Sequence, residues 1–119
     1  MGNENYITIT DLPGMEVSGI EFVRDYIEIH FDGPILRCIS YPTVQSLESR
    51  WKLPEPGSRD AICELIGTIV ESVDLDDDTM LTAKFSNGYK LFIPLDMRSR
   101  RDPEAMHFVP GINLPIQVW

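Results

Sequence analysis

Residues 26–39 read YIEIHFDGPILRCI, two alternating segments rich in β-branched side chains on either side of Asp32-Gly33. Such alternation is typical of a half-buried strand, and Asp-Gly between two strands favours a two-residue type I′ hairpin turn. With that turn, one face of the hairpin is apolar and the other pairs Glu28 with Arg37. The expected apolar pairs are Phe31–Pro34, Ile29–Leu36 and Ile27–Cys38.

A second hairpin of the same kind is predicted in residues 80–93, MLTAKFSNGYKLFI. A three-residue turn with Gly88 left-handed keeps one face apolar but places Lys84 opposite Lys90, a like-charge pair. A two-residue Asn87-Gly88 turn avoids that pair but mixes Lys90 with apolar neighbours. We prefer the three-residue turn, because burial of the apolar face outweighs an exposed repulsion. Its apolar pairs are Phe85–Tyr89, Ala83–Leu91 and Leu81–Ile93.

Each hairpin follows a similar lead-in strand, which begins Gly19-x-x-Phe22 in the first copy and Gly67-x-x-Val70 in the second. The chain is therefore expected to be α+β and mostly β, with two three-stranded antiparallel meanders as a pseudo-repeat. These would form a bent sheet or small open barrel with one short helix. The length of 119 residues suits a single domain spanning residues 1–119.

The segments outside the meanders have weaker signals. Residues 6–10 and 115–119 are predicted to be short strands, the second of them tied into the fold. Residues 41–57, rich in Pro and Gly, are expected to be a connection, and residues 96–111 an irregular loop.

One short helix is predicted between the meanders. Ser58 is the expected N-cap, and Gly67 is expected to end the helix after Ile66. Helical spacing places four apolar residues on the side that would pack on a sheet. These are Ala61, Ile62, Leu65 and Ile66.

Charge and cysteine content limit the classes of function. Nineteen acidic residues against ten basic ones give a net charge of −9, which disfavours nucleic acid and anionic membrane as partners. Cys38 and Cys63 lack the short spacing of a metal or redox motif, and two reduced, buried thiols are expected. The N-terminus has no signal-peptide pattern, so a cytoplasmic location is expected.

Residues 96–111 hold the first candidate site. Arg98, Arg101, Glu104 and His107 are predicted to bind a small anionic ligand, since guanidinium groups match phosphate and carboxylate. Two alternatives stay open: the arginines pair with flanking acidic residues, and His107 is structural rather than a base or metal ligand.

The second candidate is a protein-binding surface made of Trp51 and the acidic residues Asp76, Asp77 and Asp78. The acidic run does not fit an EF-hand, because Thr79 stands where that loop needs Gly and Phe85 where it needs Glu. A solvated acidic turn is expected instead. Trp51 has the alternative role of covering one end of the core.

Catalytic motifs are not found in the sequence. There is no Gly-x-Ser-x-Gly elbow, no phosphate-binding glycine loop and no dinucleotide fingerprint. We therefore predict no catalytic residue, no metal site and no cofactor.

From about residue 26 to its end, the chain resembles a group of small bacterial proteins with no assigned activity. The resemblance is carried by the hairpin at 32–34, Leu65-Ile-Gly67, Phe85-x-x-Gly88-x-x-Leu91, and the tail stretches 103–111 and 115–119. It implies no role for any residue. In size and charge the chain is also similar to the acidic immunity proteins that accompany bacterial toxins.

Two functions follow as hypotheses. The first is a non-catalytic protein-binding module, immunity-like, that presents an acidic surface to a partner; a homodimer that covers open sheet edges is compatible with it. The alternative is a small-ligand (anion) binding protein or enzyme that uses residues 96–111. A concave pocket that joins the four candidate residues would favour the alternative, and a flat acidic face with Trp51 exposed would favour the first.

Overall fold

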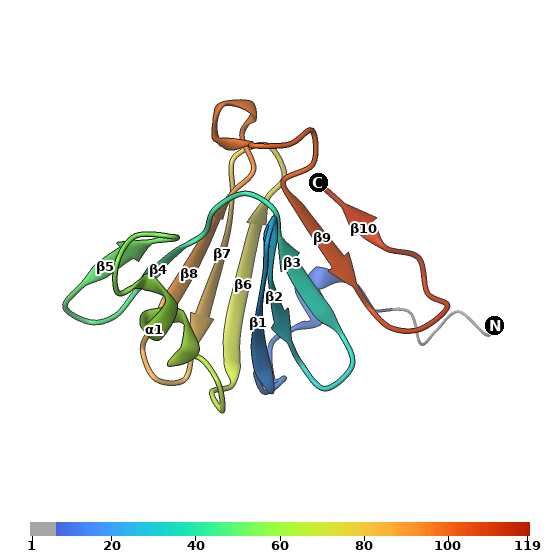
Figure 1. Ribbon diagram of the computed structural model, residues 1–119. Helices are drawn as coiled ribbons and strands as arrows, with labels where there is room; N and C mark the ends of the chain where they lie inside the picture. Colours follow the sequence, from blue (N-terminus) through green and yellow to red (C-terminus); the bar gives the residue numbers. More distant parts are fainter. Residues whose placement is uncertain (1–6) are drawn as a thin grey trace.

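Two five-stranded antiparallel sheets make up most of the computed structural model, which describes residues 7–119 (Figure 1). The first sheet has the order β1-β2-β3-β9-β10 and the second β5-β4-β8-β7-β6. The first sheet consists of β1 (Gly19–Val23), β2 (Tyr26–His30), β3 (Ile35–Cys38), β9 (Met106–Val109) and β10 (Gln117–Val118). The second consists of β4 (Thr43–Gln45), β5 (Arg50–Lys52), β6 (Val70–Asp76), β7 (Met80–Phe85) and β8 (Lys90–Pro94).

The expected fold class is confirmed: the protein is mostly β, with two antiparallel meanders and one short α-helix. The meanders are β1-β2-β3 and β6-β7-β8, and each lies in its own sheet. Within residues 7–119 the two sheets do not close into a barrel.

The first hairpin has the predicted register. Glu28 lies opposite Arg37, and Asp32 and Gly33 both have the positive φ that a type I′ turn requires, 55° and 139°. The core side of this hairpin is buried as expected. Its cross-strand pairs are Ile29–Leu36 and Ile27–Cys38.

The second hairpin follows the preferred three-residue turn. Phe85 N–H donates to the Tyr89 carbonyl, Gly88 has a φ of 88°, and Lys84 lies opposite Lys90. The register therefore buries the apolar face at the expense of one like-charge pair. The buried pairs are Leu81–Ile93 and Ala83–Leu91.

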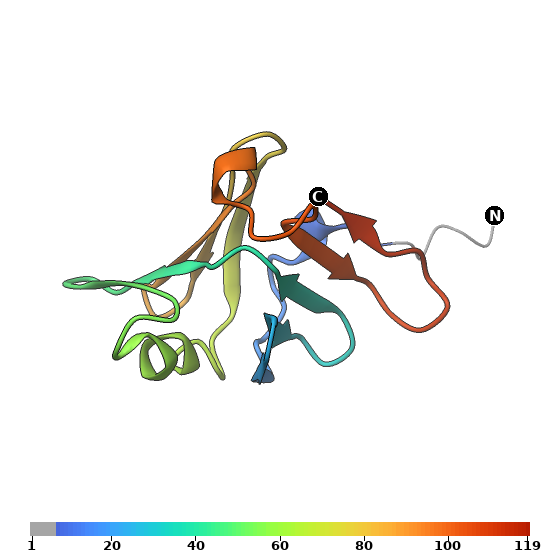
Figure 2. The ribbon, with the colours of Figure 1, turned by 45° about the horizontal axis from the view of Figure 1, so that its top comes forward.

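The two halves of the chain exchange hairpins, a feature that the sequence did not predict. After β3 the chain crosses to the other sheet, where β4 pairs with β8. After β8 it crosses back, and β9 pairs with β3. Each sheet is thus one meander extended by the hairpin that follows the other meander, and Figure 2 shows these hairpins, β4-β5 and β9-β10, at opposite ends of the molecule.

Backbone hydrogen bonds join the segment before β1, residues 14–17, to the segment that leads into β6, residues 67–70. Gly14 N–H donates to the Val70 carbonyl, and Val17 N–H donates to the Thr68 carbonyl. A single hydrophobic core contains residues from both sheets. Its largest fully buried side chains include Phe85, Phe108, Leu36, Leu91 and Ile93.

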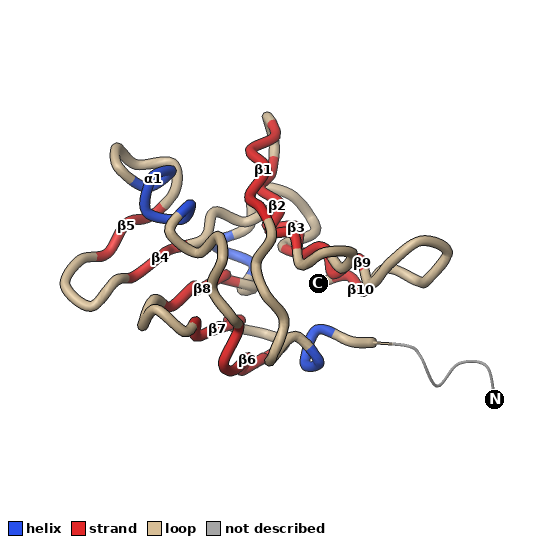
Figure 3. Tube along the Cα trace, turned by 90° about the horizontal axis from the view of Figure 1, so that it is seen from below, coloured by secondary structure: helices blue, strands red, loops and turns tan. Residues whose placement is uncertain are grey.

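The helix is shorter than predicted, and its N-cap lies one residue before the predicted one. α1 (Ser58–Cys63) has Gly57 as its N-cap, at a φ of 87°, so Ser58 is not the cap. The chain continues in tighter turns to Gly67, and Ile66 is 47% exposed instead of facing the sheet. Figure 3 shows α1 on the same side of the molecule as β4 and β5, which it contacts.

Three other segments differ from expectation because pairing partners, not local pattern, determine their structure. Residues 41–57 hold two short strands, β4 and β5, and the supposed loop 96–111 holds the 3-10 helix η3 (Met97–Ser99) and strand β9. Ile9–Asp11 is the 3-10 helix η2 rather than strand, and residue 6 lies outside the described residues. The last predicted strand is confirmed as β10.

Candidate functional site

A cavity of about 140 Å³ opens beside the β1–β2 turn, between the two sheets and α1. We call it the arginine pocket. Its lining comes from β1 to β3, the β3–β4 connection, the segment after β5, α1, and the segment after η3. The lining residues are Phe22, Val23, Arg24, Tyr26, Ile27, Cys38, Tyr41, Pro42, Leu53, Pro54, Arg59 and Arg101.

Positive charge is concentrated in this pocket. Arg24, Arg59 and Arg101 line it, whereas no Asp or Glu does, although the whole chain carries a net charge of −9. Within the described residues none of the three arginines takes part in an ion pair. The pocket lining is therefore locally positive on an acidic protein.

Arg101 is the fixed member of the three. Its Nη2 donates to the carbonyls of Asp25 and Ile39, both at 2.7 Å, and its Nη1 donates to the Tyr41 hydroxyl at 3.2 Å. The guanidinium carbon also lies 3.8 Å from the centre of the Tyr41 ring. These partners are neutral, so they hold the guanidinium in place without cancelling its charge.

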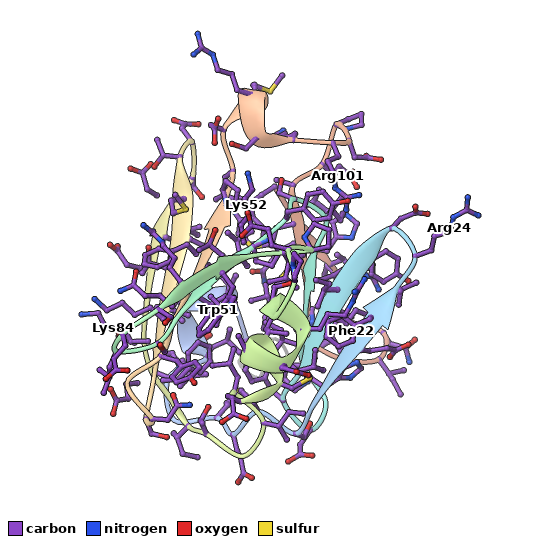
Figure 4. All side chains as sticks on the ribbon, turned by 60° about the vertical axis from the view of Figure 1, so that its left-hand side comes forward. Phe22, Arg24, Trp51, Lys52, Lys84 and Arg101 are labelled. Carbon is purple, nitrogen blue, oxygen red and sulfur yellow. The ribbon has the colours of Figure 1, made fainter. Side chains whose placement is uncertain are left out.

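All three arginines are exposed, but no side-chain hydrogen bond is found for Arg24 or Arg59 within the described residues. The guanidinium of Arg59 lies 5.9 Å from the centre of the Phe22 ring, and Phe22 is 40% exposed on the edge strand β1. Arg24 extends outward from the tip of the β1–β2 hairpin, away from Arg101, as Figure 4 shows. Both side chains are free to adjust to a ligand, in contrast to the anchored Arg101.

The floor of the pocket is apolar. Ile27, Cys38 and Leu53 are buried there, and burial raises the pKa of the Cys38 thiol to about 12. The thiol is therefore neutral at physiological pH and is not an activated nucleophile.

A second cavity of about 330 Å³ lies on the other side of Arg101. Its lining includes Asp25, Asp102 and Glu104 as well as Tyr26, Ile39 and Arg101. Because three carboxylates face it, this cavity is a poor site for an anion.

The candidate residues of the 96–111 segment are only partly brought together. Arg101 and Glu104 line the second cavity, and Glu104 Oε1 lies 2.6 Å from His107 Nε2. Arg98 is exposed on η3 and lines neither cavity. The four residues do not share one pocket.

His107 belongs to a row of polar side chains on the outer face of the first sheet. Direct cross-strand neighbours link Glu21, Glu28, Arg37 and His107 from β1 to β9. Arg37 Nε donates to Glu28 Oε2 at 2.8 Å, and Arg37 Nη1 lies 3.1 Å from His107 Nδ1. With Arg37 donating to Nδ1, Nε2 of His107 donates to Glu104, so both ring nitrogens are occupied.

The protein-binding candidates lie in two separate places. Trp51, in β5, is half-buried and packs against the core, with its indole beside Gly57. Asp76 ends β6, and the exposed Asp77 and Asp78 form the turn before β7. Asp77 accepts a hydrogen bond of 2.9 Å from Trp119 Nε1.

Sequence reasoning found Arg101 but missed the other members of the arginine pocket. Phe22, Arg24 and Arg59 come from two elements that no motif connects, and only the packing of α1 against β1 brings them together. A surplus of arginine over lysine, seven against three, was the one available signal, but it does not indicate any particular position.

Comparison with protein-family models, curated proteins and solved structures found no match for this chain. Among residues 7–119, the helices are all too short or too polar to cross a bilayer. Function is therefore inferred from the chain's own residues.

Proposed function

We propose that this protein is a non-catalytic small-ligand-binding protein that holds an anionic group in the arginine pocket. The observation that carries the proposal is the lining itself, which contains three arginines and no carboxylate in a chain of net charge −9. Arginine is well suited to this role, because its planar set of donors matches the oxygens of phosphate and carboxylate.

The size and walls of the pocket define the ligand class. About 140 Å³ is below the usual range for a whole drug-sized ligand, but it accommodates one anionic head group and a few adjoining atoms. Phe22, Tyr26 and Tyr41 supply aromatic surface beside the arginines. The preferred ligand is thus an aryl or other planar compound that carries a phosphate or carboxylate.

Phenyl phosphate and inorganic phosphate are the probes for this site, titrated at low and moderate salt by calorimetry and by amide NMR shifts. Phenyl phosphate should bind saturably and more tightly than phosphate. The Arg59→Ala variant should weaken binding about tenfold or more, the loss of about one charge-assisted hydrogen bond. Arg101 is not substituted, because it ties the β1–β2 turn to the β3–β4 connection.

Lys84→Ala is the matched control, because it removes one positive charge from an exposed position on β7 outside the pocket (Figure 4). The affinity of this variant for phenyl phosphate should equal that of the wild type. Equal weakening by Arg59→Ala and Lys84→Ala would show that general charge, not the pocket, attracts the probe. The absence of saturable binding would overturn the proposal.

A cytoplasmic location is part of the proposal. It is supported by the two free cysteines, Cys38 and Cys63, which suit a reducing compartment.

A second candidate is an immunity-like protein-binding module that uses the acidic turn. It is favoured by the exposure of Asp76, Asp77 and Asp78, which form no ion pair within the described residues. Capture of a partner from lysate should then be lost in an Asp76→Lys/Asp78→Lys variant and kept in His107→Ala. Equal capture by both variants would contradict this candidate.

A further inference from the structure

Glu21, Glu28 and His30 converge on the outer face of the first sheet, away from the arginine pocket. Glu21 on β1 lies directly opposite Glu28 on β2, and His30 follows two residues later on the same face. One ligand atom from each side chain lies within 4.8 Å of the other two. Among the described residues, this is the one group of three such side chains that gathers so closely.

The three side chains combine an unpaired nitrogen with two carboxylates that lie close together. His30 Nε2 is buried and has no hydrogen-bond partner, although Glu21 Oε1 and Glu28 Oε1 lie 3.3 and 3.4 Å away. Two carboxylates directly opposite each other on neighbouring strands repel, and Glu28 is only 7% exposed. A cation between the three groups would give the nitrogen of His30 a partner and would also offset the repulsion between the two carboxylates.

We propose that Glu21, Glu28 and His30 bind a divalent zinc-type cation. Zinc takes histidine nitrogen and carboxylate oxygen at about 2.0–2.1 Å, and tetrahedral geometry then separates neighbouring ligand atoms by about 3.3–3.4 Å. The two nitrogen–oxygen separations in the structure, 3.3 and 3.4 Å, equal that edge, and the two carboxylates lie within 4.8 Å of each other. An octahedral cation with bonds of about 2.1 Å would need about 3.0 Å.

Arg37 supports the site from the next strand. Its Nε donates to Glu28 Oε2 at 2.8 Å, which leaves Oε1 directed at His30. Hydrogen bonds of this kind orient the ligands of metal sites. The side chain of Glu21 is 59% exposed, so its carboxylate is free to move toward a cation held by Glu28 and His30. Three protein ligands leave one coordination position for water or a small ligand.

The test is zinc chloride titrated by calorimetry into the tag-free protein, together with the zinc-induced change in melting temperature. The wild type should bind one equivalent, and His30→Asn and Glu21→Gln should each bind at least tenfold more weakly. Glu21→Gln should also be no less stable than the wild type without metal, because it removes the repulsion with Glu28. Its zinc-induced stabilisation should nevertheless be reduced.

His107→Gln is the matched control, because it removes the other histidine of the same sheet face, which has a single carboxylate neighbour. Its zinc affinity should stay within about twofold of the wild type. Cobalt in place of zinc should give the intense visible absorption of a four-coordinate site. Three outcomes would overturn the proposal: no saturable binding by the wild type, unchanged affinity in Glu21→Gln and His30→Asn, or an equal loss in His107→Gln.

Discussion

Burial gives the two cysteines different chemistry. Cys38 is fully buried in β3, and desolvation raises its pKa to about 12. Cys63 is half-buried at the end of α1, and its pKa is raised by burial and then by the negative charges of Asp60 and Glu64. Neither thiol is therefore an activated nucleophile, but only Cys63 is within reach of solvent.

A thiol reagent such as dithiobis-nitrobenzoate should therefore modify one cysteine in the native protein, more slowly than a free thiol. The second should react only after unfolding. Mass spectrometry of the labelled peptides would identify Cys63 as the accessible residue. Labelling of Cys38 at the same rate under native conditions would contradict its burial.

The raised pKa of Cys38 also links stability to pH. An unfolded thiol ionises near pH 9, whereas the folded one stays protonated to about pH 12, so the folded state binds more protons in this range. This contribution to stability is complete below about pH 9 and decreases as pH rises further, by at most about 1.4 kcal/mol per unit. In Cys38→Val the decrease between pH 8 and pH 10 should be smaller, as measured by urea unfolding.

At the scale of elements, the second hairpin keeps an unfavourable pair. Lys84 lies directly opposite Lys90 because any register that separates them would expose the apolar face. Lys84→Glu should raise the free energy of unfolding by about 0.2–1 kcal/mol, and added salt should reduce the gain. Lys84→Gln, which removes repulsion without adding attraction, should give a smaller gain in the same urea experiment. A loss of stability in both variants would show that Lys84 contributes through packing instead.

The hairpins were predictable because their signals are local. Alternation, a turn residue with positive φ and one apolar face agree at Asp32-Gly33 and again at Gly88. β4, β5 and β9 were missed because each is three or four residues long, and their extended structure depends on pairing with β8, β3 or each other. Ser58 fails as a cap because Gly57 takes the left-handed conformation that starts the helix.

At the scale of the whole molecule, Trp119 connects the two sheets. Its backbone pairs with Met106 of the first sheet, and its indole Nε1 donates to Asp77 in the β6–β7 turn of the second. A double-mutant cycle of Trp119→Phe and Asp77→Ala should show a coupling of about 0.5–1.5 kcal/mol in the free energy of unfolding. The neighbouring exposed residue provides the control: Asp78→Ala should show no coupling to Trp119→Phe. Coupling of equal size to both aspartates would indicate a general charge effect.

The sequence by itself determined the class of fold, the register of the first hairpin with its Glu28–Arg37 pair, and the acidic character of the chain. For the second hairpin it gave a preference between two registers, which the structure then decided. These features depend on residues close together along the chain, where side-chain period and turn chemistry act directly. Only the tertiary structure decided the exchange of hairpins between the sheets, the gathering of Phe22, Arg59 and Arg101, and the position of His30 between two carboxylates. Those arrangements come from the burial of one shared core, which brings together residues that no local pattern relates.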